Sequence, residues 1–251
     1  MALQSTASGE PAGHAPVLQL HQVRLTWPGA RQPVIDLPDL QVLARQRLML
    51  RGGSGCGKTT LLSLAAGVLL SDQGQVRLLG QDWRALRAGA RDARRVDHVG
   101  YLFQQFNLLP YLSVLDNVLM PCRFSARRQA QAVQSHGSPL AAAQALLDAL
   151  ELPQTLWSRG ADALSVGQQQ RVAAARALIG QPELVLADEP TSALDEDNRD
   201  RFMQLLGAQC ARSGCALLFV SHDSRLAPHF DAVLDLPRLN RATRASGQEA
   251  V

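Results

Sequence analysis

The chain has 251 residues, of which 46% are hydrophobic, and its 25 basic residues against 22 acidic ones give a formal net charge of +3. These values predict a globular domain with at most two lobes, and so small a charge gives little support for a nucleic-acid-binding protein. No apolar run approaches the roughly 20 residues that a membrane-spanning helix requires. We therefore expect a chain that does not cross a bilayer.

Residues 1–16 lack the basic start and the apolar stretch of a secretory signal, so they are predicted to form a disordered tail. Four cysteines without C-x-x-C spacing are interpreted as reduced thiols of a cytoplasmic protein. These are Cys56, Cys122, Cys210 and Cys215.

The only lysine of the chain, Lys58, lies in a glycine-rich segment, GGSGCGKT, at residues 52–59. This segment matches G-x-x-x-x-G-K-[ST], the pattern of a phosphate-binding loop. A strand predicted over 47–50 precedes it and a helix predicted over 59–70 follows it, which is the context that such a loop requires. Glycines allow backbone N–H groups to face a polyphosphate, Lys58 adds a point charge, and Thr59 offers a hydroxyl to Mg²⁺. The alternative is a glycine-rich connector that matches by chance.

Two later segments carry further polar groups at the ends of predicted elements. In LSVGQQQR, at residues 164–171, Ser165 is predicted to cap a helix that ends before Gly180; it could serve as a cap alone or also bind phosphate oxygens. In ELVLADE, at residues 183–189, an apolar strand ends in two carboxylates. Asp188 could hold a metal through water and Glu189 could polarise an attacking water, although acid pairs also end ordinary strands.

The order of these segments resembles that of the nucleotide-binding subunit of ABC transporters, and the resemblance covers residues 17–236. In that family's terms, the matches are the Walker A loop at 52–59, the Q-loop at 103–105, the signature at 164–168, Walker B at 184–189, the D-loop at 192–195 and the switch histidine at 220–223.

The resemblance implies an α/β fold: a P-loop NTPase core with a parallel sheet, a flanking antiparallel β subdomain and an α-helical subdomain that carries the signature. Segments 17–25 and 34–43 read as strands of the flanking sheet, and about 107–162 as the helical subdomain, with Ser138 and Pro139 starting one helix. The ATPase domain is expected to cover 17–240, followed by a C-terminal tail at 241–251.

The family's mechanism implies a head-to-tail homodimer that binds ATP and Mg²⁺ between two copies. Lys58, Glu189 and His222 are the expected catalytic residues, with Glu189 as the base and His222 at the γ-phosphate. The expected nucleotide-binding residues are Trp27, Gly52, Gly53, Ser54, Gly55, Cys56, Gly57, Lys58, Thr59, Thr60, Gln104, Ser165, Gly167 and Asp195, of which Ser165 and Gly167 act in trans. Mg²⁺ is expected at Thr59, Gln104 and Asp188. Trp27 falls where the family carries an aromatic that stacks on adenine, and a turn aromatic is the equal alternative.

The sequence departs from the family at Val166, where the signature usually has glycine. A β-branched residue resists positive φ, so we expect Val166 to be the first helical residue after Ser165, with negative φ. A second departure is Ser192-Ala193 in the D-loop, where members often have glycine and asparagine.

Residues 103–110, 112–118 and 186–191 resemble the lipoprotein-releasing and macrolide-exporting group. This resemblance implies an ATPase that drives a separate integral membrane permease for export or extraction, on the inner face of the cytoplasmic membrane. The alternative is an ATPase that regulates a membrane-bound cell-envelope complex without transport. A ribosome-acting or DNA-repair protein is disfavoured, because the chain holds one cassette and no heptad run spans 104–165. No nucleic-acid partner is expected.

Two surface predictions follow. The segment 106–117 is expected to form the coupling surface for the membrane subunit, with Leu108, Leu109 and Leu112 beside Tyr111. A stripe of arginines at predicted helical spacing is interpreted as a solvated face: Arg84, Arg87, Arg91, Arg94 and Arg95.

Overall fold

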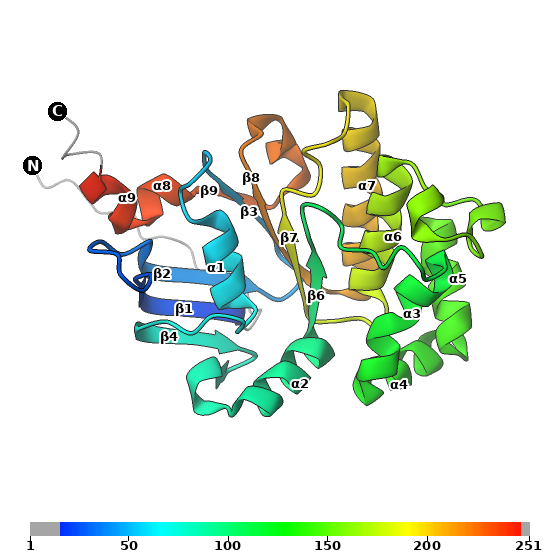
Figure 1. Ribbon diagram of the computed structural model, residues 1–251, viewed down its shortest axis with the longest axis horizontal. Helices are drawn as coiled ribbons and strands as arrows, with labels where there is room; N and C mark the ends of the chain where they lie inside the picture. The colour runs from blue at the N-terminus through cyan, green and yellow to red at the C-terminus, as the bar shows by residue number, and fades with distance from the viewer. Residues whose placement is uncertain (1–15, 247–251) are drawn as a thin grey trace, which may run out of the picture.

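The computed structural model describes residues 16–246, which form two sheets with helices around and between them (Figure 1). The larger sheet has five strands in the order β6-β7-β8-β3-β9, and every pairing in it is parallel. Its strands are β3 (Arg47–Arg51), β6 (Val99–Leu102), β7 (Leu184–Asp188), β8 (Ala216–Ser221) and β9 (Ala232–Asp235). The predicted parallel core is confirmed.

The smaller sheet is antiparallel, with the order β2-β1-β4-β5. Its strands are β1 (Pro16–Leu25), β2 (Ile35–Leu43), β4 (Gln73–Leu78) and β5 (Gln81–Asp82). Helix α1 (Lys58–Ala65) lies between the two sheets in Figure 1. This sheet is the predicted flanking β subdomain.

Successive side chains of the parallel strands point to alternate faces of the sheet and so divide the apolar core into two clusters. Leu48 and Leu50 of β3 pack into a cluster with α1 and the antiparallel sheet, whereas Met49 between them joins a cluster with the helices on the opposite face. Leu184 and Val185 of β7 divide in the same way. Because successive side chains of a strand point to opposite faces, a sheet covered on both sides reads as a continuous apolar run.

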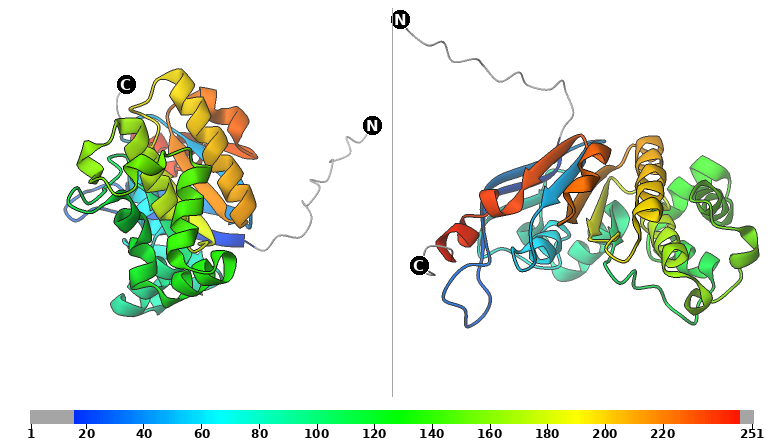
Figure 2. Two further views of the ribbon diagram at one scale, coloured as in Figure 1. Left: turned by 90° about the vertical axis from the view of Figure 1, so that its right-hand side faces the viewer. Right: turned by 90° about the horizontal axis from the view of Figure 1, so that it is seen from above.

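The helical subdomain lies at the end of the molecule opposite the antiparallel sheet (Figure 2). It consists of α3 (Val114–Phe124), α4 (Ala126–His136) and α5 (Pro139–Ala149), against which α6 (Val166–Leu178) and α7 (Glu196–Ser213) pack. The Ser138 side chain accepts from the Ala141 N–H and Pro139 occupies the first turn, as predicted. The remaining helices are η1 (Trp83–Ala85), α2 (Ala88–His98), η2 (Gln154–Leu156), η3 (Ala161–Ala163), η4 (Ser224–His229), α8 (Leu236–Leu239) and α9 (Arg241–Ser246).

The helix predicted over 59–70 is shorter than expected, because α1 ends at Ala65. Gly67 has a φ of 66°, and a Cβ there would lie 2.5 Å from the ring of Trp83. The buried Trp83 ring therefore packs where a helical residue with a side chain would stand. The break depends on a contact between residues sixteen positions apart, which the apolar run itself does not reveal.

The arginine stripe is not the simple solvated face that we predicted. Arg91 donates to the Leu86 carbonyl, Arg94 to the Leu78 carbonyl and Arg95 to the Gly67 carbonyl. Their acceptors lie before α2, in the antiparallel sheet and after α1. The exposed Arg84 also donates to a backbone carbonyl, that of Gly74, whereas the Arg87 side chain is exposed and, among residues 16–246, donates no such bond.

The predicted tails fall mostly outside the described residues. Pro16 is the first residue of β1 and the other residues of the 1–16 tail are not described, while part of the 241–251 tail forms α9. Among residues 16–246, no helix combines the length and the apolar character that crossing a membrane requires.

Candidate nucleotide site

The glycine-rich loop connects β3 to α1 and wraps around the Lys58 side chain. Gly57 caps α1 with a φ of 95° and Gly55 has a φ of 78°, both in the left-handed region that glycine adopts without penalty. The Lys58 Nζ donates to the Gly52 carbonyl at 2.8 Å and the Gly53 carbonyl at 2.7 Å, and the residue is only 7% exposed. The loop is thus folded around its single cation.

Next to Lys58 is a cavity of about 580 Å³ that gathers most of the predicted site residues. Its lining comprises Val34, Gly53, Ser54, Gly55, Gly57, Lys58, Thr59, Thr60, Gln104, Asp188, Glu189 and His222. Three of these come from the ends of parallel strands, because Asp188 ends β7, Glu189 follows it and His222 follows β8. Ligands of open α/β sheets bind at this carboxyl edge.

Asp188 and Glu189 have different environments although they are adjacent. Burial, with the charge of the neighbouring Glu189, raises the pKa of the Asp188 carboxyl, and the nearby Thr59 hydroxyl and Lys58 charge only partly oppose this shift. Burial also acts to raise the pKa of Glu189, but hydrogen bonds with Lys58 and His222 outweigh it, so that this pKa is lowered. The site therefore favours an ionised Glu189 beside an Asp188 carboxylate that benefits from a cation.

Glu189 is fixed by its backbone as well as by its side chain. Its Oε1 lies 3.0 Å from Lys58 Nζ and its Oε2 lies 2.8 Å from His222 Nδ1. Its φ is 40°, and its N–H donates to the Val220 carbonyl at 3.0 Å. A non-glycine residue in this region is strained, and such strain is concentrated at functional sites.

Several expected site residues lie away from this cavity. Gly52 and the buried Cys56 lie within the loop but not on the cavity wall. Trp27 is 44% exposed, and the Ala30 N–H donates to its carbonyl in a turn, so both interpretations of Trp27 remain predictions. Ser165, Gly167 and Asp195 also lie outside the cavity lining of their own chain.

The signature segment begins a regular helix. The Ser165 hydroxyl accepts from the Gln168 N–H and the Gln168 side chain accepts from the Ser165 N–H, which completes a capping box. Val166 is the first residue of α6 and is absent from the positive-φ residues of the described chain, which confirms our expectation. Its side chain is 46% exposed.

Two features of the site were missed by the sequence predictions. Val34, immediately before β2, lines the cavity. Arg199 of α7 lies 2.8 Å from Asp223, the residue after His222, and this pair connects the helix after the D-loop to the switch loop. Neither shows a local signal, because each depends on contacts between segments that are distant in the chain.

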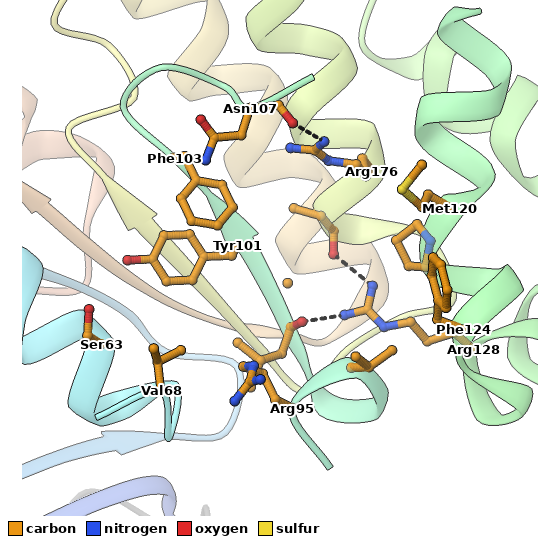
Figure 3. Close-up of a pocket in the computed structure, with 15 residues that line it drawn as sticks. Ser63, Val68, Arg95, Tyr101, Phe103, Asn107, Met120, Phe124, Arg128 and Arg176 are labelled. Atoms are coloured by element: carbon orange, nitrogen blue, oxygen red, sulfur yellow. Dashed lines mark hydrogen bonds between the residues drawn. The ribbon is translucent and has the colours of Figure 1, made fainter. Parts of the chain in front are cut away.

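A second cavity, of about 420 Å³, forms a groove between α2, β6, α3 and α6 (Figure 3). Phe124 and Val68 in its wall are 75% and 57% exposed, and Tyr101 stacks on Phe103 with ring centroids 4.2 Å apart. Of the predicted coupling segment 106–117, only Asn107 lines this groove. Leu108 instead packs against the core of the helical subdomain.

Arginines bound to backbone carbonyls make up part of the groove wall. Arg176 donates to the Asn107 carbonyl at 2.6 Å, and Arg128 donates to the carbonyls of Val99 and Ala177 (Figure 3). Burial lowers the pKa of Arg128 to about 10. These contacts hold α4, α6 and β6 together beneath the groove.

The amino-acid sequence matches a family model and several known proteins. A family model described as ABC transporter matches residues 36–192. The chain is 38% identical over 205 residues to the lipoprotein-releasing system ATP-binding protein LolD of Chromohalobacter salexigens, covering 81% of this chain and 82% of that protein. It is 33% identical over 247 residues to the macrolide export ATP-binding/permease protein MacB of Shigella flexneri, covering 94% of this chain but 37% of that protein.

A solved structure supports the same relationship. This structure is a dimeric, post-hydrolysis state of the ATP-binding cassette MJ0796 bound to ADP and Pi. The match has a TM-score of 0.76 and 30% identity, and it covers 87% of this chain and 94% of the other. The resemblance inferred from the sequence is confirmed by these matches.

Proposed function

The chain belongs to the ABC transporter family and has its ATPase domain, and we propose that it binds and hydrolyses ATP to drive a separate membrane subunit. The observation that carries this proposal is the convergence of Lys58, Glu189 and His222 in one cavity beside the phosphate loop. Phosphoryl transfer depends on positioning and charge stabilisation, and this cavity provides groups for both.

The phosphate loop and Lys58 are proposed to bind the ATP phosphates. Left-handed glycines at 55 and 57 shape a loop whose backbone N–H groups can face an anion, at the N-terminus of α1. Lys58 lies 3.0 Å from Glu189, so an incoming phosphate competes with that carboxylate for the ammonium group. Binding of ATP therefore weakens the hold of Lys58 on Glu189.

Mg²⁺ fits the residues on the other side of the cavity. Asp188, Thr59 and Gln104 offer the oxygen donors that this cation prefers. The positive charge would also offset the cost of burying the ionised Asp188 carboxylate, which is what raises its pKa. When bound, Mg²⁺ would neutralise phosphate charge. Thr59 and Asp188 already line the same cavity, so two of these oxygen donors lie on one wall of the site.

Glu189 is proposed to accept the proton of the attacking water. Its lowered pKa keeps the carboxylate ionised near neutral pH, and its contact with His222 fixes the direction of one oxygen. His222, whose side chain is 60% exposed and lines the same cavity, is proposed to contact the γ-phosphate.

A second copy of the chain is proposed to complete the site. Ser165 and Val166 are exposed at the N-terminus of α6 and do not line the cavity of their own chain. A head-to-tail arrangement would place this helix terminus, with Gly167 and the D-loop residue Asp195, on the nucleotide of the partner. A helix N-terminus suits such a phosphate contact.

The groove of Figure 3 is proposed to dock a short helix of an integral membrane permease. Its exposed apolar side chains, Phe124 and Val68, suit an apolar helix face, and Phe103 precedes Gln104 of the nucleotide cavity. Such docking would connect the membrane subunit to the nucleotide, and we propose that it holds the chain on the cytoplasmic face of the membrane. Export or extraction of a substrate is the proposed outcome, supported by the likeness to proteins named for lipoprotein release and macrolide export.

ATP turnover by the purified chain with Mg²⁺ tests the enzymatic proposal. Glu189→Gln should lower the rate by roughly 10²-fold to 10⁴-fold, because the base is lost while the shape of the site is kept. Glu151→Gln, at an exposed carboxylate that pairs with Arg201, serves as the control and should hydrolyse ATP like the parent. Parent-like turnover of Glu189→Gln would contradict the role assigned to Glu189.

A further inference from the structure

The side chain of Asn240, which follows α8, is completely buried next to the phosphate loop. Its Nδ2 donates to the Val34 carbonyl at 2.9 Å and to the Cys56 carbonyl at 3.5 Å. Its Oδ1 accepts from the Asp36 N–H at 2.8 Å and from the Ala242 N–H at 3.3 Å. A single amide thus joins the C-terminal helices, the start of β2 and the phosphate loop.

The two segments whose carbonyls accept hydrogen bonds from the Asn240 Nδ2 both border the nucleotide cavity. Val34 lines it directly, and Gly57, the residue after Cys56, lines it from the loop. The two segments are closely packed, because a Cβ on Gly57 would lie 2.9 Å from Ile35 Cδ1 and 3.3 Å from the Val34 oxygen. A small movement of either segment therefore changes the shape of the cavity wall.

The contact with Cys56 has a direct consequence for the loop amides. The Cys56 carbonyl and the Gly57 N–H belong to one trans peptide, so they point in opposite directions. The Cys56 carbonyl points toward the Asn240 Nδ2, so the Gly57 N–H points away from Asn240. Asn240 itself does not line the cavity.

We propose that Asn240 is a positioning residue for ATP: its amide fixes the Cys56–Gly57 peptide so that the Gly57 N–H faces the phosphates, and it fixes Val34 in the cavity wall. The inference rests on the proposed phosphate-binding role of the loop. Asn240 makes no contact with the nucleotide in this account, so its loss lowers affinity and leaves the chemical step largely unchanged.

The test compares Asn240→Ala with the parent by calorimetric titration of ATP and of inorganic tripolyphosphate, and by steady-state ATP turnover. We expect the Kd of both ligands and the KM for ATP to rise roughly tenfold, the effect of one lost positioning hydrogen bond, with kcat within about threefold. The Kd of both ligands should rise because the affected N–H faces the phosphates, which ATP and tripolyphosphate share, and not the adenine ring.

Trp157→Phe is the matched control, because it removes a buried hydrogen bond to the Leu152 carbonyl in the helical subdomain. It should lower the thermal midpoint and leave both Kd values like those of the parent. Asn240→Asp carries the test if the alanine variant does not fold, since it keeps the Oδ1 acceptor and replaces the donor with an oxygen that faces two carbonyls. Its Kd should rise at least as much as that of Asn240→Ala.

A folded Asn240 variant with parent-like Kd values and a lowered thermal midpoint would overturn the inference, because Asn240 would then act on stability alone. That outcome would leave the proposed function intact. Failure of the parent chain to bind either ligand would instead contradict the proposed function itself.

Discussion

The Nζ of Lys58 lies 3.0 Å from Oε1 of Glu189, so the only lysine of the chain is paired with the carboxylate that follows β7. The same lysine donates to two carbonyls of the phosphate loop. An ammonium group held by three oxygens is oriented before any phosphate arrives. The pairing also couples phosphate binding to the state of Glu189, because the two anions compete for one cation.

The pH profile of ATP turnover should depend on His222. Burial raises the pKa of Glu189, and the hydrogen bonds from Lys58 and His222 lower it by more. His222→Ala removes one of these bonds, so the Glu189 pKa should rise and activity should be lost at a higher pH as the solution is acidified. The acid limb of kcat/KM measures this shift.

The rate should also fall in His222→Ala, by roughly 10-fold to 10³-fold, as for a lost contact to developing charge. His136→Ala, at an exposed histidine that ends α4, is the control and should keep the parent profile. An unchanged acid limb in His222→Ala would show that His222 does not set the pKa of Glu189.

Asp223 should contribute to stability in a pH-dependent way. Hydrogen bonds from Arg225 outweigh burial and, with the charges of Arg199 and Arg225, lower the pKa of Asp223 to about 2. A carboxyl whose pKa is lower in the folded chain stabilises it above the unfolded value of about 3.9, and this contribution is lost as pH falls toward 2. Asp223→Asn should therefore lower the free energy of unfolding by about 1 to 2 kcal/mol at pH 7.

Urea unfolding at several pH values measures this contribution, and the difference between parent and Asp223→Asn should shrink below about pH 4. Asp92→Asn, at an exposed carboxylate on α2, should change stability by less than about 0.5 kcal/mol. A difference for Asp223→Asn that is constant across this pH range would exclude the ionic origin.

Val166→Gly should leave ATP turnover within about threefold of the parent. Val166 already begins α6 without a positive φ, so glycine relieves no backbone strain there and slightly disfavours the helix. Steady-state turnover of the two proteins at saturating ATP is the measurement. A gain of orders of magnitude in the glycine variant would mean that Val166 impairs the signature.

Phe124→Asp and Tyr111→Asp distinguish two surfaces for the membrane subunit. Both side chains are exposed, but Phe124 lines the groove and Tyr111 lies in the segment 106–117 outside it. We expect Phe124→Asp to reduce co-purification with the co-expressed membrane permease subunit, while ATP turnover of the isolated chain is kept. Loss of co-purification in Tyr111→Asp alone would favour the original prediction for 106–117.

Local sequence patterns predicted much of this molecule. Gly55 and Gly57 beside Lys58 adopt left-handed backbone. Ser138 and Ser165 cap helices by accepting a hydrogen bond from the N–H three residues later. An apolar run that ends in Asp188 forms a buried strand. Each of these features depends on neighbours within a few residues.

The features that the sequence did not predict depend on pairs of distant residues. Trp83 ends α1 by packing on Gly67, and Arg94 bonds to the Leu78 carbonyl instead of facing solvent. Asn240 reaches Val34, 206 positions away, and Arg199 reaches Asp223 across the α7 and β8 elements. No local pattern marks such contacts, because only the folded topology brings the partners together.

Two copies of the chain are proposed to enclose ATP, and the mass of Glu189→Gln in solution tests this dimer most directly. Light scattering during size-exclusion chromatography, with ATP and Mg²⁺ in the buffer, should give twice the 27.1 kDa mass of one chain, and without nucleotide it should give one. The added change Ser165→Arg, which places a bulky cation at the helix terminus proposed to meet the partner's nucleotide, should return the variant to a monomer. A Glu189→Gln protein that binds ATP and stays monomeric at every concentration would contradict the account.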